Sequence, residues 1–592
     1  MQAHELRQTK SEVMGDNVRP VLNGQEKATD VETCEASAPK SGSGCASTLS
    51  RMVLWIPVQY RDELWQLFRL AGPVVISQLM MVMIGFISMV FCGHLGKTEL
   101  AGVSLSIAVL NVTGISIGTG LSLTCDTLIS QTYGSGNLKR VGVILQRGIL
   151  ILLLACFPCW AILINTEALL LAVRQSPEVA SISQLYVKIF MPALPAAFMY
   201  QLQGRYLQNQ GIIWPQVITG AIGNILNTLI NYVFLFLLDL GVAGSAAANA
   251  ISQYLLATVL FIYISWRGLH KATWGGWSLD CLQEWGPFIQ LAIPSMLMLC
   301  LEWWLFEVGS FLAGIIGEVE LGAQSVVYEL AVVAYMAPLG FAAAASVRVG
   351  NALGAGNVEQ AKLSSKVPIV CTFIIACLFG VILAVTRNGI GYIFTTEHEI
   401  IQRVSEVMVI FCFTHLFDAI AGVTGGVLRG VGKQLVGALC NLVGYYFIGF
   451  PIGVSLMFAA GMGIQGLWTG LTICVLMQSI FFVAYLSKLD WKKAAEEARV
   501  RAGVQKKEKQ MVQLDEADST QNQAVATTLS CRRAEDDEEV QTPEQDKTTT
   551  TIVGDVLSVT QLVLRRGLAV FIMLLILAAG ILSDAYLTKL LK

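Results

Sequence analysis

Four acidic residues stand inside long apolar runs of the second half of the chain, where ionisable side chains are rare. They are Glu302, Glu307, Glu329 and Asp418. A charged side chain at the depth of a bilayer costs about 2.5–3.5 kcal/mol on insertion scales, so such residues are candidates for function. The alternative interpretation of each is a buried structural hydrogen bond.

Carboxyl groups in such surroundings predict an exchange of protons for cations. Loss of hydration and repulsion between neighbouring carboxylates both favour the protonated form, so we expect one or more of the four acids to titrate near physiological pH. A carboxyl group poised in this way holds either a proton or a cation, and the two compete. This competition is the chemistry of an antiporter: protonation on one side of the membrane releases an organic cation, and deprotonation on the other side restores the site.

Helical spacing predicts how these acids are arranged. Glu302 and Glu307 are about 140° apart around a helix of 3.6 residues per turn, so they need not face the same cavity. His415 and Asp418 are three residues apart and share a helix face, so we expect His415 to hydrogen-bond or relay protons to Asp418. We expect no Lys or Arg deep in the second half to pair with the acids.

Aromatic and amide side chains complete the predicted site. Trp303 and Tyr328 adjoin acids in the sequence, and a cation over an aromatic face gains about 0.5–2 kcal/mol. Acids and aromatic rings in an apolar cleft therefore suit flat or bulky organic cations. The alternative for each tryptophan is contact with lipid at the membrane interface. From the first half of the chain, we expect Gln78 and Asn111 to contribute neutral hydrogen bonds.

The composition indicates which elements hold these residues. The chain has 592 residues and a formal net charge of -3, with 54% hydrophobic and only 14% charged residues. Of its 81 Asp, Glu, Lys and Arg residues, only 34 fall within 66–486. Such an apolar core cannot cover itself with water-compatible side chains. This excludes a cytosolic enzyme, a secreted disulfide scaffold and a nucleic-acid binder, and we expect no enzymatic activity.

The 14 cysteines give no sign of a metal or redox site. Most lie in apolar runs, and none has the paired spacing of a zinc site in a polar loop. Cys156 and Cys159 have the spacing of a redox motif, but their position in a membrane segment favours a packing role. We therefore expect no metal and no cofactor. The carboxyl groups described above predict H+ as the coupling ion. The polar N-terminus lacks the apolar segment of a signal peptide.

Thirteen apolar runs are long enough to cross a bilayer, which takes about 20 residues per helix. Backbone groups in lipid must find partners within their own segment, so each run predicts a helix. The runs lie near 70–92, 101–123, 143–164, 182–203, 214–238, 245–266, 287–312, 321–343, 367–386, 402–427, 434–459, 464–486 and 567–582.

The Lys and Arg residues of the short loops predict the orientation. A cytoplasmic N-terminus places eleven of them inside, Arg429 among them, and four outside. We therefore expect 1–65 to be a polar cytoplasmic N-terminus and 488–566 to be a disordered cytoplasmic tail. Between them lie an N-lobe at 66–270 and a C-lobe at 271–487. A thirteenth helix at 567–588 then places the C-terminus outside.

The two sets of six runs resemble each other at an offset of 220–222 residues. The matched pairs include Pro73 and Pro294, Glu99 and Glu320, Gly134 and Gly354, Leu207 and Leu428, Gly223 and Gly444, and Gly241 and Gly463. Because six is an even number of crossings, both halves share one orientation. We therefore expect an all-α membrane protein of two six-helix bundles, related by a pseudo-twofold axis along the membrane normal, plus a C-terminal thirteenth helix. Two such halves around a central cavity are typical of secondary transporters.

Over about residues 60–490, the chain resembles the eukaryotic, animal-type branch of the multidrug and toxin extrusion (MATE) family. The segments that carry the resemblance are Gln78–Met80, Phe91–Gly96, Asn111–Thr113, Cys125–Gly134, Glu302–Trp303, Tyr328–Glu329, Arg348–Gly354 and Gly425–Gly430.

The resemblance implies two lobes and electroneutral, proton-coupled export of organic cations such as drugs, toxins and metabolites. It places the protein in the plasma membrane, at the apical face of polarised cells. Glu302, Glu307 and Glu329 fall on acidic positions of the family. Asp418 stands where relatives carry Glu, so its side chain is one methylene shorter. The first-helix aspartate of some bacterial relatives is absent.

We therefore expect a monomeric proton-coupled antiporter that works by alternating access. Its expected partners are small organic cations, protons and membrane lipid, with no nucleic acid. One alternative is a sodium-coupled multidrug exporter, and another is a channel or scaffold. An open pore does not need several titratable acids in only one half, which disfavours the channel. We also expect transport to survive deletion of the chain beyond about residue 490.

Overall fold

Helices make up every regular element in the part of the chain that the structure describes, as lipid-embedded backbone requires. The structure is a computed structural model, and it describes residues 57–93, 95–395, 397–504 and 556–591. Thirteen of its helical segments are long and apolar enough to cross a membrane. This confirms the predicted all-α class and the predicted number of spans.

Several spans are built from more than one element. The first half contains α2 (Val58–Gly93), α3 (Lys97–Leu110), η1 (Asn111–Ile115), α4 (Ser116–Ser122), α5 (Thr124–Gly134), α6 (Leu138–Leu163), α7 (Thr166–Ala172), α8 (Pro177–Phe190), η2 (Met191–Ala193), α9 (Leu194–Gln208), α10 (Trp214–Tyr232), η3 (Val233–Leu237) and α11 (Gly241–Trp266). The second half contains η4 (Leu279–Leu282), α12 (Trp285–Ile316), α13 (Glu318–Gly354), α14 (Val358–Thr386), η5 (Ile390–Ile393), α15 (His398–Val431), α16 (Gln434–Asn441), η6 (Leu442–Gly449), α17 (Phe450–Val454), η7 (Ser455–Ala459) and α18 (Ile464–Ser487), followed by α19 (Trp491–Arg501) and α21 (Val559–Leu591).

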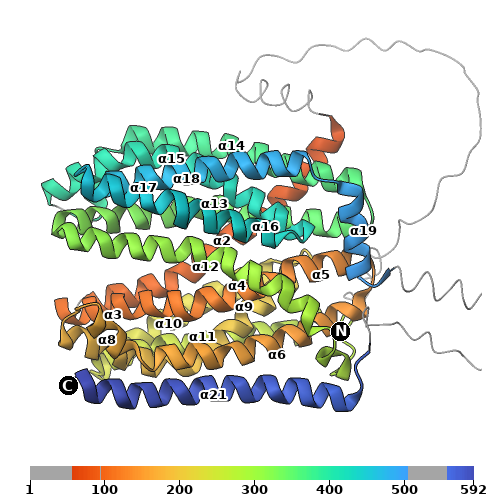
Figure 1. Cartoon of the computed structure of the whole chain (residues 1–592), viewed down its shortest axis with the longest axis horizontal. Coiled ribbons are helices and arrows are strands. Elements are labelled where there is room, and N and C mark those ends of the chain that lie inside the picture. The colour runs from red at the N-terminus through yellow and green to blue at the C-terminus, as the bar shows by residue number, and fades with distance from the viewer. Residues whose placement is uncertain (1–56, 94, 396, 505–555, 592) are drawn as a thin grey trace, which may run out of the picture. The chain divides into compact units, whose positions relative to one another are not determined.

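The helices form two groups, which lie side by side in Figure 1. We call α3 to α11 the N-lobe and α13 to α18 the C-lobe. Buried apolar side chains of the N-lobe form one large cluster. Those of the C-lobe form two, one toward each end of its helices. Apart from a small cluster of Val74, Ile213 and Ala343 where the lobes meet, the two lobes therefore have separate cores.

The first helix of each repeat, α2 or α12, crosses from one lobe to the other. Leu67, in the first half of α2, is fully buried in a C-lobe cluster, whereas Ile84, in its second half, belongs to the N-lobe cluster. In α12, Phe288 lies in the N-lobe cluster and Leu305 in a C-lobe cluster. Both helices contain an internal proline between these regions. Part of each lobe's core is thus formed by the first helix of the other repeat.

The structure differs from the predicted disordered tail at 488–566. Residues Trp491–Arg501 form α19, and its Trp491 and Ala498 pack into a C-lobe cluster. The Ala-rich face of this segment covers apolar surface that the neighbouring helix ends would otherwise expose, which the charge-based prediction overlooked. The middle of the predicted tail, 505–555, lies outside the described residues.

The last helix packs against the N-lobe. It begins at Val559, before the predicted start, and runs beside α6 (Figure 1). The Asn165 side-chain amide donates to the carbonyl oxygen of Gly580 at 2.9 Å. Gly580 allows this approach, because an added Cβ there would lie 2.7 Å from Ala161. The thirteenth span is therefore attached to one lobe.

Candidate functional site

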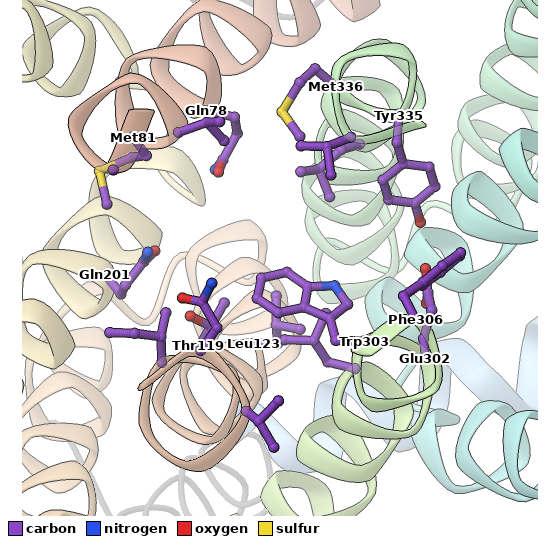
Figure 2. A pocket seen from close by; sticks show the side chains of 18 of the residues that line it. Gln78, Met81, Thr119, Leu123, Gln201, Glu302, Trp303, Phe306, Tyr335 and Met336 are labelled. Atoms are coloured by element: carbon purple, nitrogen blue, oxygen red, sulfur yellow. The ribbon is translucent and has the colours of Figure 1, made fainter. Parts of the chain in front are cut away.

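A cavity of about 460 Å³ lies between the lobes, and its lining includes Glu302, Glu307, Glu329 and Asp418. Three helices supply these acids: α12, α13 and α15. The structure thus brings all four sequence-predicted acids to one space. Figure 2 shows side chains from both lobes pointing into it.

Both acids of α12 face the cavity, despite their angular separation. The cavity extends around α12 and includes Glu302, Trp303, Phe306 and Glu307 in its lining. The Trp303 indole projects into the space between the lobes (Figure 2). The hydroxyl of Tyr335, on α13, points toward the Glu302 carboxylate (Figure 2). Glu302 and Trp303 are both half-buried, so an entering molecule can reach them.

Tyr328 and Glu329 extend the acidic wall along α13. Glu329 is exposed, whereas Tyr328 is half-buried. The Tyr328 ring packs on Phe306, with 5.8 Å between ring centroids, and Phe306 packs on Trp468 at 6.0 Å. Aromatic rings therefore stand beside the acids, where a bulky cation that enters the cavity can lie over their faces.

The first repeat contributes the predicted amides. Gln78 lies on α2, five residues after Pro73, and Asn111 begins the π-helical segment η1. Both line the cavity. A single π-helical turn shifts the register of a helix and is frequent at functional sites. In η1, the Val112 carbonyl oxygen accepts a bond of 3.0 Å from the Trp304 indole of α12, which ties the two lobes together beside the cavity.

The predicted partnership of His415 with Asp418 is wrong. His415 is buried and is not among the described residues that line the cavity. Its ring packs between those of Phe379 and Phe411, with centroids 5.6 and 6.0 Å away. The two side chains share a broad helix face, but His415 turns toward α14 and the interior of the C-lobe, whereas Asp418 turns toward the cavity.

The expectation that no base lies near the acids is also wrong. Arg429 lines the cavity and interacts electrostatically with Glu302. Arg429 follows Asp418 by eleven residues, about three helical turns, so both lie on the same face of α15. This spacing was readable in the sequence. The prediction missed it because it placed Arg429 in a loop, whereas α15 continues to Val431.

Arg429 belongs to a buried charge cluster at one end of the cavity, which we call the cavity floor. Asp126 of α5 is fully buried, with a carboxylate oxygen 3.6 Å from Arg205 and 3.9 Å from Arg429. The Asn209 amide donates to the other oxygen at 3.1 Å. Arg205 also lines the cavity. The floor therefore joins the N-lobe to the C-lobe by a shared carboxylate and presents positive charge to the acidic walls.

We call the end of the bundle below this floor the α19 end. It carries α19 and the loops at 135–137, 209–213, 355–357 and 432–433. Among the described residues, the bonds that cross the lobes here include one of 2.8 Å from the Gln131 amide to the Gly430 carbonyl oxygen. The Thr127 hydroxyl also donates to the Arg429 carbonyl oxygen at 2.5 Å. The cavity is therefore closed on this side.

At the α19 end, α5 of the N-lobe packs closely on α13 of the C-lobe, and glycines make this close contact possible. A Cβ added to Gly354 would overlap the backbone of Gln131, and one added to Gly134 would overlap that of Asn351. Overpacking of this kind typically costs about 1–3 kcal/mol.

Gly354→Ala should therefore hinder closure of this end and slow substrate counterflow severalfold. Gly72→Ala is the matched control, since a Cβ there meets nothing within 4 Å, and an equal loss in both variants would contradict this role.

The arrangement suits reversible binding of positively charged, partly apolar molecules. Carboxylates supply charge, aromatic rings supply a polarisable surface, and amides supply neutral hydrogen bonds. Within the described residues, no group of three or more His, Cys, Asp or Glu side chains is placed to hold a metal ion.

Comparisons with known proteins agree with this architecture. A family model described as MatE matches residues 73–233 and 294–455, so the two matches begin at the prolines that the repeat pairs. The chain is 64% identical over 588 residues to Multidrug and toxin extrusion protein 1 of Danio rerio, covering 96% of this chain and 98% of that protein. It is 59% identical over 445 residues to the protein of the same name from Homo sapiens, covering 75% of this chain and 78% of that one.

A solved structure shows the same fold. The crystal structure of the eukaryotic MATE transporter AtDTX14 superposes with a TM-score of 0.73 at 31% identity, covering 75% of this chain and 100% of that chain. Together with the thirteen membrane-crossing segments, these matches show that the chain belongs to the MATE family and is a multi-pass membrane transport protein, not an enzyme.

Proposed function

We propose that this protein is a proton-coupled antiporter that exports organic cations from the cell across the plasma membrane. The observation that carries the proposal is the gathering of four carboxyl groups from α12, α13 and α15 in one interlobe cavity with aromatic rings. The names of the relatives, multidrug and toxin extrusion proteins, support drugs and toxins as substrates.

The exchange rests on competition at the acidic wall. A cation entering from the cytoplasm binds while the carboxylates are charged. Once the cavity faces outside, protons bind to the acids and remove the attraction that holds the substrate. Return to the cytoplasmic side then releases the protons. Exchange of one proton for one monovalent cation moves no net charge, so each pH unit supplies about 1.4 kcal/mol, a tenfold substrate gradient.

Two lobes around one central site support alternating access as the mechanism. The distribution of Lys and Arg predicts that the α19 end is cytoplasmic, so the closed floor corresponds to an outward-facing arrangement. Reaching the other arrangement requires the lobes to part at the α19 end, between Asp126 and Arg429. Such rocking of two repeats around a fixed site is the usual mechanism of secondary transporters.

Uptake of a fluorescent organic cation into cells tests this function. With an outward proton gradient imposed across the membrane, the transporter runs in reverse, so uptake should rise about tenfold per pH unit at equilibrium. Cells expressing Glu302→Gln serve as the control, because they report the cation that binds to cells or crosses the membrane without being transported. Equal uptake with and without the gradient would exclude proton coupling, and uptake that stops when sodium is replaced by an inert cation would indicate sodium coupling instead.

A further inference from the structure

The helix α19 is built into the C-lobe, although it lies outside both segments matched by the family model. It begins at a cap in which the Asp490 carboxylate accepts bonds of 3.1 Å from the backbone N–H groups of Lys492 and Lys493. Its apolar face, with Trp491 and Ala498, is buried in the C-lobe. It must therefore move with the C-lobe.

The other end of α19 contacts the N-lobe. The Arg501 Nε donates to the Gln131 Oε1 of α5 at 2.9 Å. One residue further, the Ala502 carbonyl oxygen accepts a bond of 3.0 Å from the Asn137 side-chain amide. Both partners belong to the N-lobe, so these bonds span the interlobe boundary at the α19 end. Figure 1 shows α19 running across this end of the bundle.

Arg501 is held for this contact from the C-lobe side. Its Nη2 donates to the Val431 carbonyl oxygen at 3.0 Å, and its Nη1 lies 3.8 Å from Glu497. Glu497 in turn pairs with Lys433 at 2.8 Å. Arg501 is therefore prepositioned by α15 and α19, and it reaches across to α5. A guanidinium fixed in this way loses little side-chain entropy when it bonds its partner.

We propose that α19 is a latch: it is anchored in the C-lobe, fastens the N-lobe through Arg501 and Ala502, and must let go before the α19 end can open. This inference rests on alternating access, but not on the identity of the coupling ion. The latch favours the arrangement in which the cavity floor is closed, and its strength sets how often the transporter samples the other one.

The latch is not a sensor of physiological pH. Burial acts to raise the pKa of Glu497, but the hydrogen bond from Lys433 and the charges of Lys433, Arg501 and Lys493 lower it overall, below its ordinary value of 4.5. Its ion pairs therefore contribute stability above the ordinary carboxyl range and lose it only as pH falls through the lowered pKa. Glu497 therefore stays charged at neutral pH and continues to hold Arg501.

A reversible cross-link tests whether the latch has to open. The hydrogen bond between the Asn137 side chain and the Ala502 backbone brings these residues into contact, so the double variant Asn137→Cys/Ala502→Cys should be cross-linked by mild oxidation or, across a longer gap, by a short bis-thiosulfonate reagent that a reducing agent removes. We expect the cross-link to stop counterflow of a labelled organic cation in proteoliposomes and a reducing agent to restore it. Each single variant, treated in the same way, controls for the native cysteines. Full counterflow in the cross-linked protein, or no cross-link at all, would overturn the proposal.

Weakening the latch supplies a second measurement. Arg501→Gln removes a charge-assisted hydrogen bond across the lobes and should shift the population toward opening at the α19 end. The KM for substrate should then fall on the cytoplasmic side and rise on the outer side, each by roughly tenfold. Lys492→Gln removes the same charge from an exposed position on the same helix. Equal KM changes in the same direction on both sides would indicate a structural role only.

These assays separate the latch from the proposed function. Counterflow exchanges labelled for unlabelled substrate and needs no proton gradient. A protein that is not proton-coupled would still show counterflow that the cross-link blocks, whereas a protein without a moving latch would show counterflow that the cross-link leaves intact.

Discussion

We expect Glu302→Gln to abolish proton-driven exchange. The exchange rate should fall at least about 100-fold, which corresponds to about 2.7 kcal/mol of activation free energy. Glu302 lies on the cavity wall among aromatic rings and faces Tyr335. The amide keeps the size of the side chain but can neither release a proton nor attract a cation. Efflux of a fluorescent cation from preloaded cells, measured against surface expression, gives the result.

The variant should still reach the membrane in normal amounts, because it replaces an acid with a neutral group of equal size in a half-buried position. Glu359→Gln is its matched control. That carboxylate is 83% exposed at the start of α14, where it pairs with Lys362. Efflux by Glu302→Gln at the rate of Glu359→Gln would refute the role assigned to Glu302.

Asp126→Asn should damage folding severely, in contrast to Glu302→Gln. The Asp126 carboxylate is fully buried between Arg205 and Arg429. Removing one partner of a buried ion cluster leaves uncompensated charge and typically costs about 3–5 kcal/mol. We expect a marked fall in the melting temperature of the detergent-solubilised protein, and little of it at the cell surface.

Asp239→Asn makes the same chemical change at an exposed site and should leave the melting temperature unaltered. Asp239 has a φ of 49°, a conformation that Asn also tolerates. A double variant tests whether charge imbalance in the cavity floor causes the loss of stability. Adding Arg429→Gln to Asp126→Asn restores the original net charge of the cluster, so it should recover part of the lost stability. No recovery would show that Asp126 acts through its other contacts.

The spans and the repeat were predictable because lipid imposes a simple rule on sequence. Backbone groups in a bilayer have to bond within their own helix, so length and hydropathy identify each crossing. The offset between Pro73 and Pro294 then predicted two related halves. The acids were predictable for the same reason, since Glu302 and Asp418 stand out against apolar neighbours that exclude charge.

Side-chain direction and helix ends were not predictable in this way. Sequence spacing placed His415 beside Asp418, but packing against Phe379 and Phe411 turned the ring elsewhere. Arg429 was assigned to a loop because hydropathy falls before the helix ends. The charges of the segment beyond residue 487 concealed the apolar face of α19. The expected dispensability of the tail therefore stays a prediction only for deletions that begin after residue 504.

The crossing of α2 and α12 makes each repeat depend on the other for its fold. A chain with only one of the two repeats would place the first half of its opening helix outside its own core, with Leu67 or Phe288 left without its packing partners. Expressed alone, a single repeat should therefore fold stably only as a pair of copies that exchange their opening helices, in the manner of domain-swapped dimers.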